Sequence, residues 1–340
     1  MKAVVVAPGP EFSVQDVYHG WLSGLRHHGV TAVPFNLHDR LNFYADCQME
    51  RDGEYRKALP MEAAVKVTLE GLLGVLYEVM PDLLVFTSGF FLDYDLIDKI
   101  RATGRHKLVM LHTESPYEDD RQVDAAQHFD LNILNDPINI DRFPAGTIYI
   151  PHAYNPAIHH PEGRSDVYDF TFVGTGYPSR SEFFEKVEWG EARVAFGGNW
   201  PNVEDDSPLA PLLLHQPGEC IDNTDTADLY RMTAMSANLY RGADPSEAER
   251  PENAEGWSMG PREVELAACG TFFCRESRGE GDALFPMLPK ISEPSELSDV
   301  LAWSLENPDL REAAADAARA AIVDRTFANN AAALLRAVDA

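Results

Sequence analysis

Short apolar runs alternate with longer segments of helical spacing along most of this 340-residue chain. The runs Lys2–Ala7, Leu83–Thr87 and Tyr168–Val173 have the length and composition of buried strands. The segments between such runs repeat apolar residues at intervals of three or four, which is typical of helices packed on one side. Strands separated by helices predict an α/β fold built on parallel, doubly wound sheets.

The first half is expected to contain a complete alternating series. Its strands are Lys2–Ala7, Val30–Phe35, Leu83–Thr87, Leu108–Leu111, Leu131–Leu134 and Thr147–Ile150. Its helices are the segment from the N-cap Ser13 through Val14 to Leu25, and then Met61–Met80, Asp93–Ala102 and Asp119–His128. Residues 36–56 are polar and show neither period.

The second half repeats the alternation after residues 150–169, which hold three prolines and three histidines and read as a linker between two domains. Its strands are Tyr168–Val173, Arg193–Phe196, Ala237–Tyr240 and Thr271–Cys274. Its helices are Ser181–Val187, Ala227–Met235, the segment from Pro261 to its C-terminal Gly270, Pro294–Leu305, and Pro308–Val338 with a break near Thr326.

Charge changes this picture more than composition does. Fifty-five acidic and 28 basic residues give a net charge of −27, a surface that repels polyanions, so nucleic acid is an unlikely partner. No apolar run is long enough to span a membrane, and the start of the chain reads as a first strand, so we expect a cytoplasmic protein. The four cysteines form no CxxC pair and no zinc spacing.

The stretch Gly260–Gly270, GPREVELAACG, is the first candidate site. A glycine and a proline lead into a helix whose free N–H groups can receive an anion, and Arg262 adds a fork of donors. Glu265, one turn further on, can accept hydrogen bonds from sugar hydroxyls. This combination fits a nucleotide sugar, although an ordinary capped helix with an exposed arginine and glutamate is an equal alternative.

Two other strand-to-helix turns contain glycines. In FVGTGYPSRSEFF, residues 172–184, Gly174, Thr175 and Gly176 precede a helix that Ser179 is expected to cap, with Arg180 beside it. Phosphate binding fits this turn, but the dinucleotide fingerprint GxGxxG is not met. The first turn, from Ala7 to Ser13, includes Gly9; a tight turn is the simpler interpretation, and a turn that admits a ligand group at the helix start is the alternative.

Candidate acids and bases lie at the ends of strands in the first half. His112 follows an apolar strand and has Glu114 beside it, and ligands of doubly wound sheets bind beyond the carboxyl ends of strands. Either residue could act as a base, and a structural histidine is the alternative. The pairs Asp119-Asp120 and Asp205-Asp206 do not form a metal-binding DxD, so no metal is expected.

Taken together, these motifs resemble nucleotide-sugar glycosyltransferases of the GT-B fold, and among them the spore-maturation-protein (CgeB-like) group of bacterial and phage proteins. The resemblance covers residues 150–338 well and the first half weakly. It rests on five segments, which are IPHAYNPAIHHPE, FVGTGYPSR, SANLYRG with its Asn238, GPREVELAACGTFFCRE, and SEPSELSDVLAWSLENPDLREAAADAAR.

The resemblance implies two Rossmann-like doubly wound domains facing a cleft, with a C-terminal helix that crosses back to the N-terminal domain. The expected bounds are residues 1–152 for the acceptor side, 153–322 for the nucleotide-sugar side and 323–340 for the returning helix. The donor-binding residues would be Gly9, Gly174, Thr175, Arg180, Asn238, Arg262, Glu263 and Glu265. The catalytic candidates would be Asp16, His112 and Glu114.

The implied activity is hexosyltransferase-like. Sugar would pass from a nucleotide diphosphate sugar, most simply a UDP-sugar, to the hydroxyl of a protein, glycan or small molecule, without metal or other cofactor. Related transferases carry a glutamate eight positions before Glu265, where this chain has Trp257. A sugar epimerase of the same fold and a catalytically degenerate binding or assembly protein are therefore the alternatives. The motifs say nothing of the oligomeric state or of whether the anomeric configuration is retained.

Overall fold

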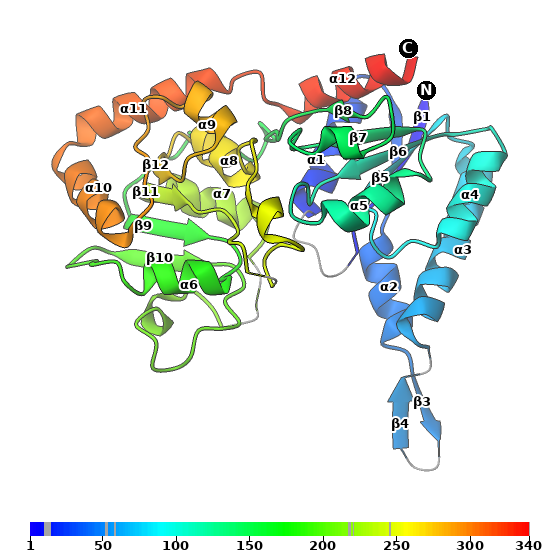
Figure 1. The fold of residues 1–340 in the computed structure, drawn as a ribbon, viewed down its shortest axis with the longest axis horizontal. Coiled ribbons are helices and arrows are strands. Elements are labelled where there is room, and N and C mark those ends of the chain that lie inside the picture. The colour runs from blue at the N-terminus through cyan, green and yellow to red at the C-terminus, as the bar shows by residue number, and fades with distance from the viewer. Residues whose placement is uncertain are drawn as a thin grey trace. The chain divides into compact units, whose positions relative to one another are not determined.

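The computed structural model describes residues 1–9, 15–51, 54–57, 59–216, 219, 221–244 and 246–339. The chain forms two compact units: unit 1 is Met1–Pro151 with Phe327–Ala340, and unit 2 is His152–Thr326. Each is an α/β unit built on its own parallel sheet (Figure 1). The α/β fold with parallel sheets that the periodicity predicts is therefore confirmed.

Unit 1 is built on a six-stranded sheet in the order β2-β1-β5-β6-β7-β8, in which every neighbouring pair is parallel. Its strands are β1 (Lys2–Val6), β2 (Thr31–Phe35), β5 (Leu83–Thr87), β6 (Lys107–His112), β7 (Leu131–Leu134) and β8 (Ile148–Tyr149). The helices are α1 (Gln15–His27), α2 (Leu37–Ala45), α3 (Met61–Val79), α4 (Tyr94–Ala102), α5 (Asp119–Ala126) and α12 (Phe327–Asp339), with the 3₁₀ turn η1 (Ile140–Arg142).

Residues 36–56, which showed no period, hold α2, β3 (Gln48–Arg51) and most of β4 (Glu54–Lys57), and the two strands pair as a hairpin. Helix α2 buries only Leu37, Leu41 and Ala45, so its apolar stripe is too thin to stand out in the sequence. Asn36 caps it by accepting a hydrogen bond from the main-chain nitrogen of Asp39. The hairpin extends from the ends of α2 and α3 (Figure 1). The expected cap Ser13 and its neighbour Val14 lie outside the described residues.

The last helix, α12, belongs to unit 1 and packs on α1 (Figure 1). Two glycines of α1 make room for its first residue. A Cβ on Gly20 would lie 2.2 Å from Cε2 of Phe327, and a Cβ on Gly24 would lie 2.3 Å from the main-chain oxygen of Phe327. The ring of Phe327 also meets the indole of Trp21 edge-on, with centroids 6.5 Å apart. Close backbone contact therefore joins the two ends of the chain within one unit.

Unit 2 is built on a four-stranded parallel sheet in the order β10-β9-β11-β12. Its strands are β9 (Tyr168–Val173), β10 (Val194–Gly197), β11 (Thr233–Asn238) and β12 (Phe272–Arg275). Its helices are α6 (Pro178–Phe184), α7 (Asn223–Arg231), α8 (Pro261–Cys269), α9 (Gly279–Leu284), α10 (Pro294–Glu306) and α11 (Pro308–Ala321), with the 3₁₀ turns η2 (Ala210–Leu212) and η3 (Pro251–Ala254). A cluster of aromatic rings, including Phe170, Phe172, Phe184, Phe196 and Trp200, fills the core.

Several predicted boundaries in unit 2 are wrong. Helix α6 begins at Pro178 with Tyr177 as its N-cap, so Ser179 lies inside the first turn and does not cap the helix. Helix α7 ends at Arg231, and the segment expected to continue it, 233–235, starts β11. All six residues of β11 are buried, and a strand buried on both faces loses the alternation that separates it from a helix. The short helix α9 was not predicted.

No helix in the described part of the chain combines the length and the apolar composition needed to cross a membrane.

Candidate functional site

The order of strands in unit 2 reverses between β9 and β11. From β9 the chain runs outward to β10, and then returns to the other side of β9 to form β11 and β12. Open parallel sheets bind ligands at such a switch point, in the crevice beyond the carboxyl ends of the two strands. Here those ends are Val173 with the following Gly174, and Asn238.

Arg262 lies at this switch point, in the first turn of α8. Its Nε donates to the main-chain oxygen of Val173 at 2.8 Å, and its Nη1 donates to Oδ1 of Asn238 at 2.7 Å. The guanidinium lies over the ring of Phe172, 4.3 Å from its centroid. The ends of both strands therefore hold the side chain of Arg262. Among the described residues, none forms a hydrogen bond with its Nη2. Arg262 can offer that nitrogen to an anion without giving up either anchor.

Gly174 makes the position of Arg262 possible. A Cβ at residue 174 would lie 2.3 Å from Nη2 of Arg262, so any other residue would displace the guanidinium. The following Thr175 is half-buried and leads into α6. The predicted donor residues Gly174, Asn238 and Arg262 are thus brought together.

Arg180 differs from the expectation that it faces a diphosphate. Its side chain is buried, and it donates to the main-chain oxygens of Thr175 at 2.9 Å and Leu239 at 2.7 Å. Its guanidinium also lies 5.0 Å from the ring centroid of Tyr177. These contacts tie the turn after β9 to the segment after β11. The geometry therefore supports a role in shaping the turn, and direct contact of Arg180 with a phosphate stays a prediction.

Glu263 stabilises the start of α8 from inside. It is fully buried and accepts hydrogen bonds from the hydroxyl of Tyr240 and from the main-chain nitrogen of the N-cap Gly260. Burial raises the pKa of Glu263 to about 7, although both hydrogen bonds and the nearby Arg275 and Arg278 act in the opposite direction. Its predicted contact with the donor is not tested by this geometry.

The raised pKa of Glu263 makes the free energy of unfolding depend on pH. Because the pKa of Glu263 rises from 4.5 to about 7 on folding, the folded state holds a proton that the unfolded state releases. The free energy of unfolding should therefore fall as pH rises from about 4.5 to 7. Glu263→Gln removes this titration. We therefore expect the difference in free energy of unfolding between the variant and the wild type to shift in favour of the variant by on the order of 2 kcal/mol from pH 5 to pH 8.

Urea unfolding of both proteins at each pH measures this difference. Glu312→Gln, at an exposed position of α11, is the control and should follow the wild type at both pH values. A wild type and a Glu263→Gln variant with parallel pH profiles would contradict the proposed titration.

Glu265 lies one turn after Arg262 on α8 and is also buried. Its Oε1 lies 3.8 Å from Nε2 of His159, a buried residue of the linker segment. Burial lowers the pKa of His159 to about 4, so the imidazole is neutral at pH 7. The ribose contact expected of Glu265 stays a prediction.

In unit 1 the strand order reverses between β1 and β5. Gly9 follows β1 and packs on the ring of Phe91, where a Cβ would lie 2.0 Å from Cδ2 of the ring. The turn after β5 contains Ser88 at φ 70° and Phe91 at φ 60°, a conformation that is rare for residues other than glycine and often marks a functional turn. The predicted Asp16 lies half-buried on α1.

His112 is the last residue of β6 and is buried. Its Nε2 lies 2.9 Å from Oδ1 of Asn132, whose Nδ2 donates to the main-chain oxygen of Ala126. That arrangement makes Nε2 the donor and leaves a lone pair on Nδ1. Burial lowers the pKa of His112 to about 4, so the side chain is neutral at pH 7. Glu114 is buried two residues further on.

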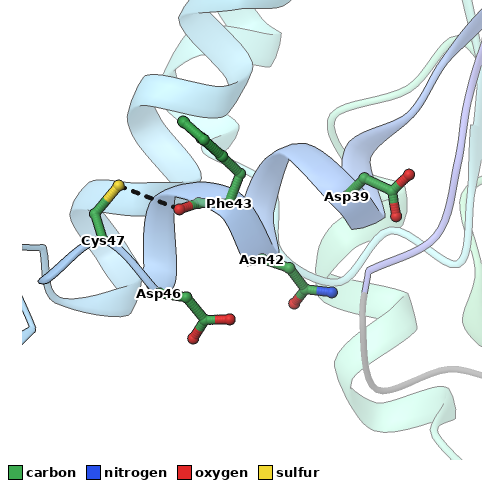
Figure 2. A pocket seen from close by; sticks show the side chains of 5 residues that line it. All are labelled: Asp39, Asn42, Phe43, Asp46 and Cys47. Atoms are coloured by element: carbon green, nitrogen blue, oxygen red, sulfur yellow. Dashed lines mark hydrogen bonds between the residues drawn. The ribbon is translucent and has the colours of Figure 1, made fainter.

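A shallow hollow on the surface of unit 1 carries none of the predicted residues. It lies beside α2 and is lined by Asp39, Asn42, Phe43, Asp46 and Cys47 (Figure 2). Its only charged side chains are two carboxylates, which would not attract a phosphate. Among the described residues no three His, Cys, Asp or Glu side chains lie close enough together to hold a metal ion.

Solved structures show the class of fold. Sucrose-phosphate synthase from Thermosynechococcus elongatus has a TM-score of 0.67 at 12% identity, over 99% of this chain and 98% of that chain. An α-glucosyltransferase in complex with UDP and a 13-mer DNA containing a HMU base has a TM-score of 0.65 at 10% identity, over 100% of both chains. HepE of Anabaena in complex with UDP-glucose has a TM-score of 0.63 at 12% identity, over 99% of both. At these identities the likeness establishes the fold, which is the GT-B fold of two Rossmann-like domains.

The sequence itself is similar to one family. Residues 169–336 match the family model described as glycosyl transferase-like. This segment covers most of unit 2, including the switch point and α8, and reaches into α12. No curated protein sequence matches the chain.

Proposed function

We propose that this protein is a glycosyltransferase that moves a sugar from a UDP-sugar to an acceptor hydroxyl, and that its relatives are the CgeB-like transferases. The observation that carries the proposal is Arg262, anchored by the ends of β9 and β11 with Nη2 engaged by no described residue. The family match over residues 169–336 and the UDP and UDP-glucose in two of the similar structures support it.

In this proposal Arg262 binds the diphosphate of the donor. The bond that breaks joins the anomeric carbon to the β-phosphate, and its electrons add negative charge to the leaving UDP. Because Asn238 and Val173 hold the guanidinium in place, its donors need not reorganise as that charge grows, which is the condition for strong electrostatic stabilisation. The start of α8 adds its N–H groups to the same anion. No step needs a metal.

Unit 1 binds the acceptor in this proposal, and its candidates for a base are His112, Glu114 and Asp16. His112 is buried and its pKa is lowered to about 4, so it holds a proton poorly at neutral pH. If the reaction inverts the anomeric centre, one of these three residues would take the proton of the acceptor hydroxyl. The net charge of −27 disfavours a nucleic-acid acceptor.

A panel of UDP, GDP and their hexose conjugates in EDTA, followed by thermal shift, tests the proposal. A ligand at 100 times its Kd stabilises the folded state by about 2.7 kcal/mol, which raises the melting temperature by several degrees. We expect UDP and at least one UDP-sugar to give this rise, and incubation with an acceptor mixture to yield a glycosylated product. No rise with any nucleotide in folded protein would overturn the proposal.

Product analysis separates the two alternatives. Release of free UDP from UDP-N-acetylglucosamine with a 2-epimerised sugar and no acceptor would replace the proposal with an epimerase. Binding of UDP-sugars without turnover on any acceptor would replace it with a degenerate binding protein. Loss of activity in EDTA, restored by a divalent cation, would refute the metal-free step.

A further inference from the structure

Arg278 holds the loop that leads into α8, residues 254–260, in place. This arginine is buried, and its Nη1 and Nη2 donate to the main-chain oxygens of Ser258 at 3.2 Å and Ala254 at 3.1 Å. Its guanidinium lies 3.7 Å from the ring centroid of Tyr240, which follows β11. The loop therefore rests on the carboxyl end of the sheet, on the same side as the switch point.

Glu280 holds the loop from α9. Its main-chain nitrogen donates to the oxygen of Trp257 at 2.9 Å, and its Oε2 accepts from the nitrogen of Met259 at 2.9 Å. The other oxygen of this buried carboxylate pairs with Arg325. With Gly260 bonded to Glu263, hydrogen bonds hold the main chain at almost every position from 254 to 260.

Trp257 stands on this rigid loop with 41% of its surface exposed. The pyrrole edge of its indole contacts Gly279, where a Cβ would lie 2.4 Å from both Cδ1 and Nε1. Only glycine at position 279 allows that contact, which fixes the ring from one side. An aromatic ring that is held in place and exposed to solvent presents a flat apolar surface, and such surfaces commonly bind ligands.

The surroundings of Trp257 favour an uncharged, hydroxyl-rich ring as the ligand. Glu252 and Glu255, both exposed, precede Trp257 by five and two residues; their carboxylates would repel a phosphate but can accept hydrogen bonds from hydroxyl groups. Three residues separate Trp257 from the helix start that carries Arg262. In a nucleotide sugar the hexose and the ribose are both joined directly to the diphosphate and the nucleobase is not, so the rings nearest the diphosphate are sugars. Of the two, the six-membered hexose offers the broader C–H face to an indole.

We infer that Trp257 is a stacking platform for the hexose of the nucleotide sugar, and so a residue that determines sugar specificity. The inference rests on the proposed function, since it takes the diphosphate to lie at Arg262. The apolar C–H face of a pyranose packs on the negative face of the indole, and the ring edges present hydroxyls to the loop. A platform of this kind selects sugars that have an unbroken C–H face on that side.

Binding of UDP and of UDP-glucose, UDP-galactose and UDP-N-acetylglucosamine to Trp257→Ala tests the inference. We expect the variant to bind UDP as the wild type does, and to bind the preferred UDP-sugar about tenfold more weakly. Trp257→Phe should keep part of the affinity, and Gly279→Ala, which displaces the indole, should reproduce part of the loss. Trp303→Ala is the matched control, because Trp303 lies on α10 of the same unit with 40% of its surface exposed.

The outcomes separate this inference from the proposed function. Equal affinities of wild type and Trp257→Ala for every UDP-sugar, with UDP still bound, would overturn the platform and leave the transferase proposal standing. An equal loss for UDP and UDP-sugars would place the uridine on the indole and also overturn it. Failure of UDP to bind the wild type would overturn both.

Discussion

Arg262→Ala is expected to remove the rise in melting temperature that UDP produces and to lower the turnover of UDP-sugar by about a hundredfold or more. The loss is large because one side chain supplies a charged donor to the leaving diphosphate and is itself fixed by two strand ends, 2.8 Å from the oxygen of Val173 and 2.7 Å from Oδ1 of Asn238. A hydrogen bond to a charged group contributes about 1.5–3 kcal/mol, and the effect on the transition state adds to the effect on binding.

Two further variants make this result specific. Arg262→Lys keeps the positive charge but cannot bond both strand ends and a phosphate at once, so it should recover part of the binding and little of the turnover. Arg193→Ala removes an exposed arginine at the opposite, amino edge of the same sheet, where it pairs with Asp169, and should leave both measurements unchanged. An Arg262→Ala protein that is folded and turns over donor at the wild-type rate would contradict the assignment.

Gly24→Ala is expected to lower the free energy of unfolding of unit 1 by about 3 kcal/mol, because overpacking against fixed backbone is costly. The added Cβ would lie 2.3 Å from the main-chain oxygen and 2.7 Å from the main-chain carbon of Phe327. Backbone cannot rotate away as a side chain can, so the first turn of α12 must shift on α1. Thermal or urea unfolding measures the change.

Gly74→Ala is the matched control for that variant. Gly74 also lies in a helix of unit 1, α3, but a Cβ there would have no atom within 4 Å. Alanine has a higher helix propensity than glycine, so this substitution should leave stability unchanged or raise it by up to about 1 kcal/mol. If Gly24→Ala proved as stable as Gly74→Ala, the close packing of α1 and α12 would be refuted.

Much of the sheet architecture could be predicted from the sequence because parallel strands buried on both faces are continuous apolar runs. Leu83–Thr87 and Tyr168–Val173 match β5 and β9 residue for residue. The prediction was wrong where that signal is ambiguous. The strand β11 follows α7 after a single residue, and all six of its residues are buried, so it shows no alternation of buried and exposed positions. Residues 36–56, which hold α2, β3 and most of β4, showed neither period.

The residues of the candidate site could be predicted only where the local sequence pattern determines their position. Arg262 follows a glycine and a proline, so its place at a helix start could be read from the chain. The contact of Arg180 with Leu239 depends on packing across 59 residues of sequence, and nothing local distinguishes a buried arginine of this kind from one facing a ligand. The supports of the loop before α8, Arg278 and Glu280, were missed for the same reason.

The membership of α12 in unit 1 sets an order of events during synthesis. Unit 2 is one uninterrupted stretch, His152–Thr326, whereas unit 1 is completed only by the helix that follows it. Unit 2 therefore needs no residue made after Thr326 to complete it, but the glycine-lined face of α1 stays uncovered until α12 has been made. The N-terminal half, although made first, is the half that finishes last.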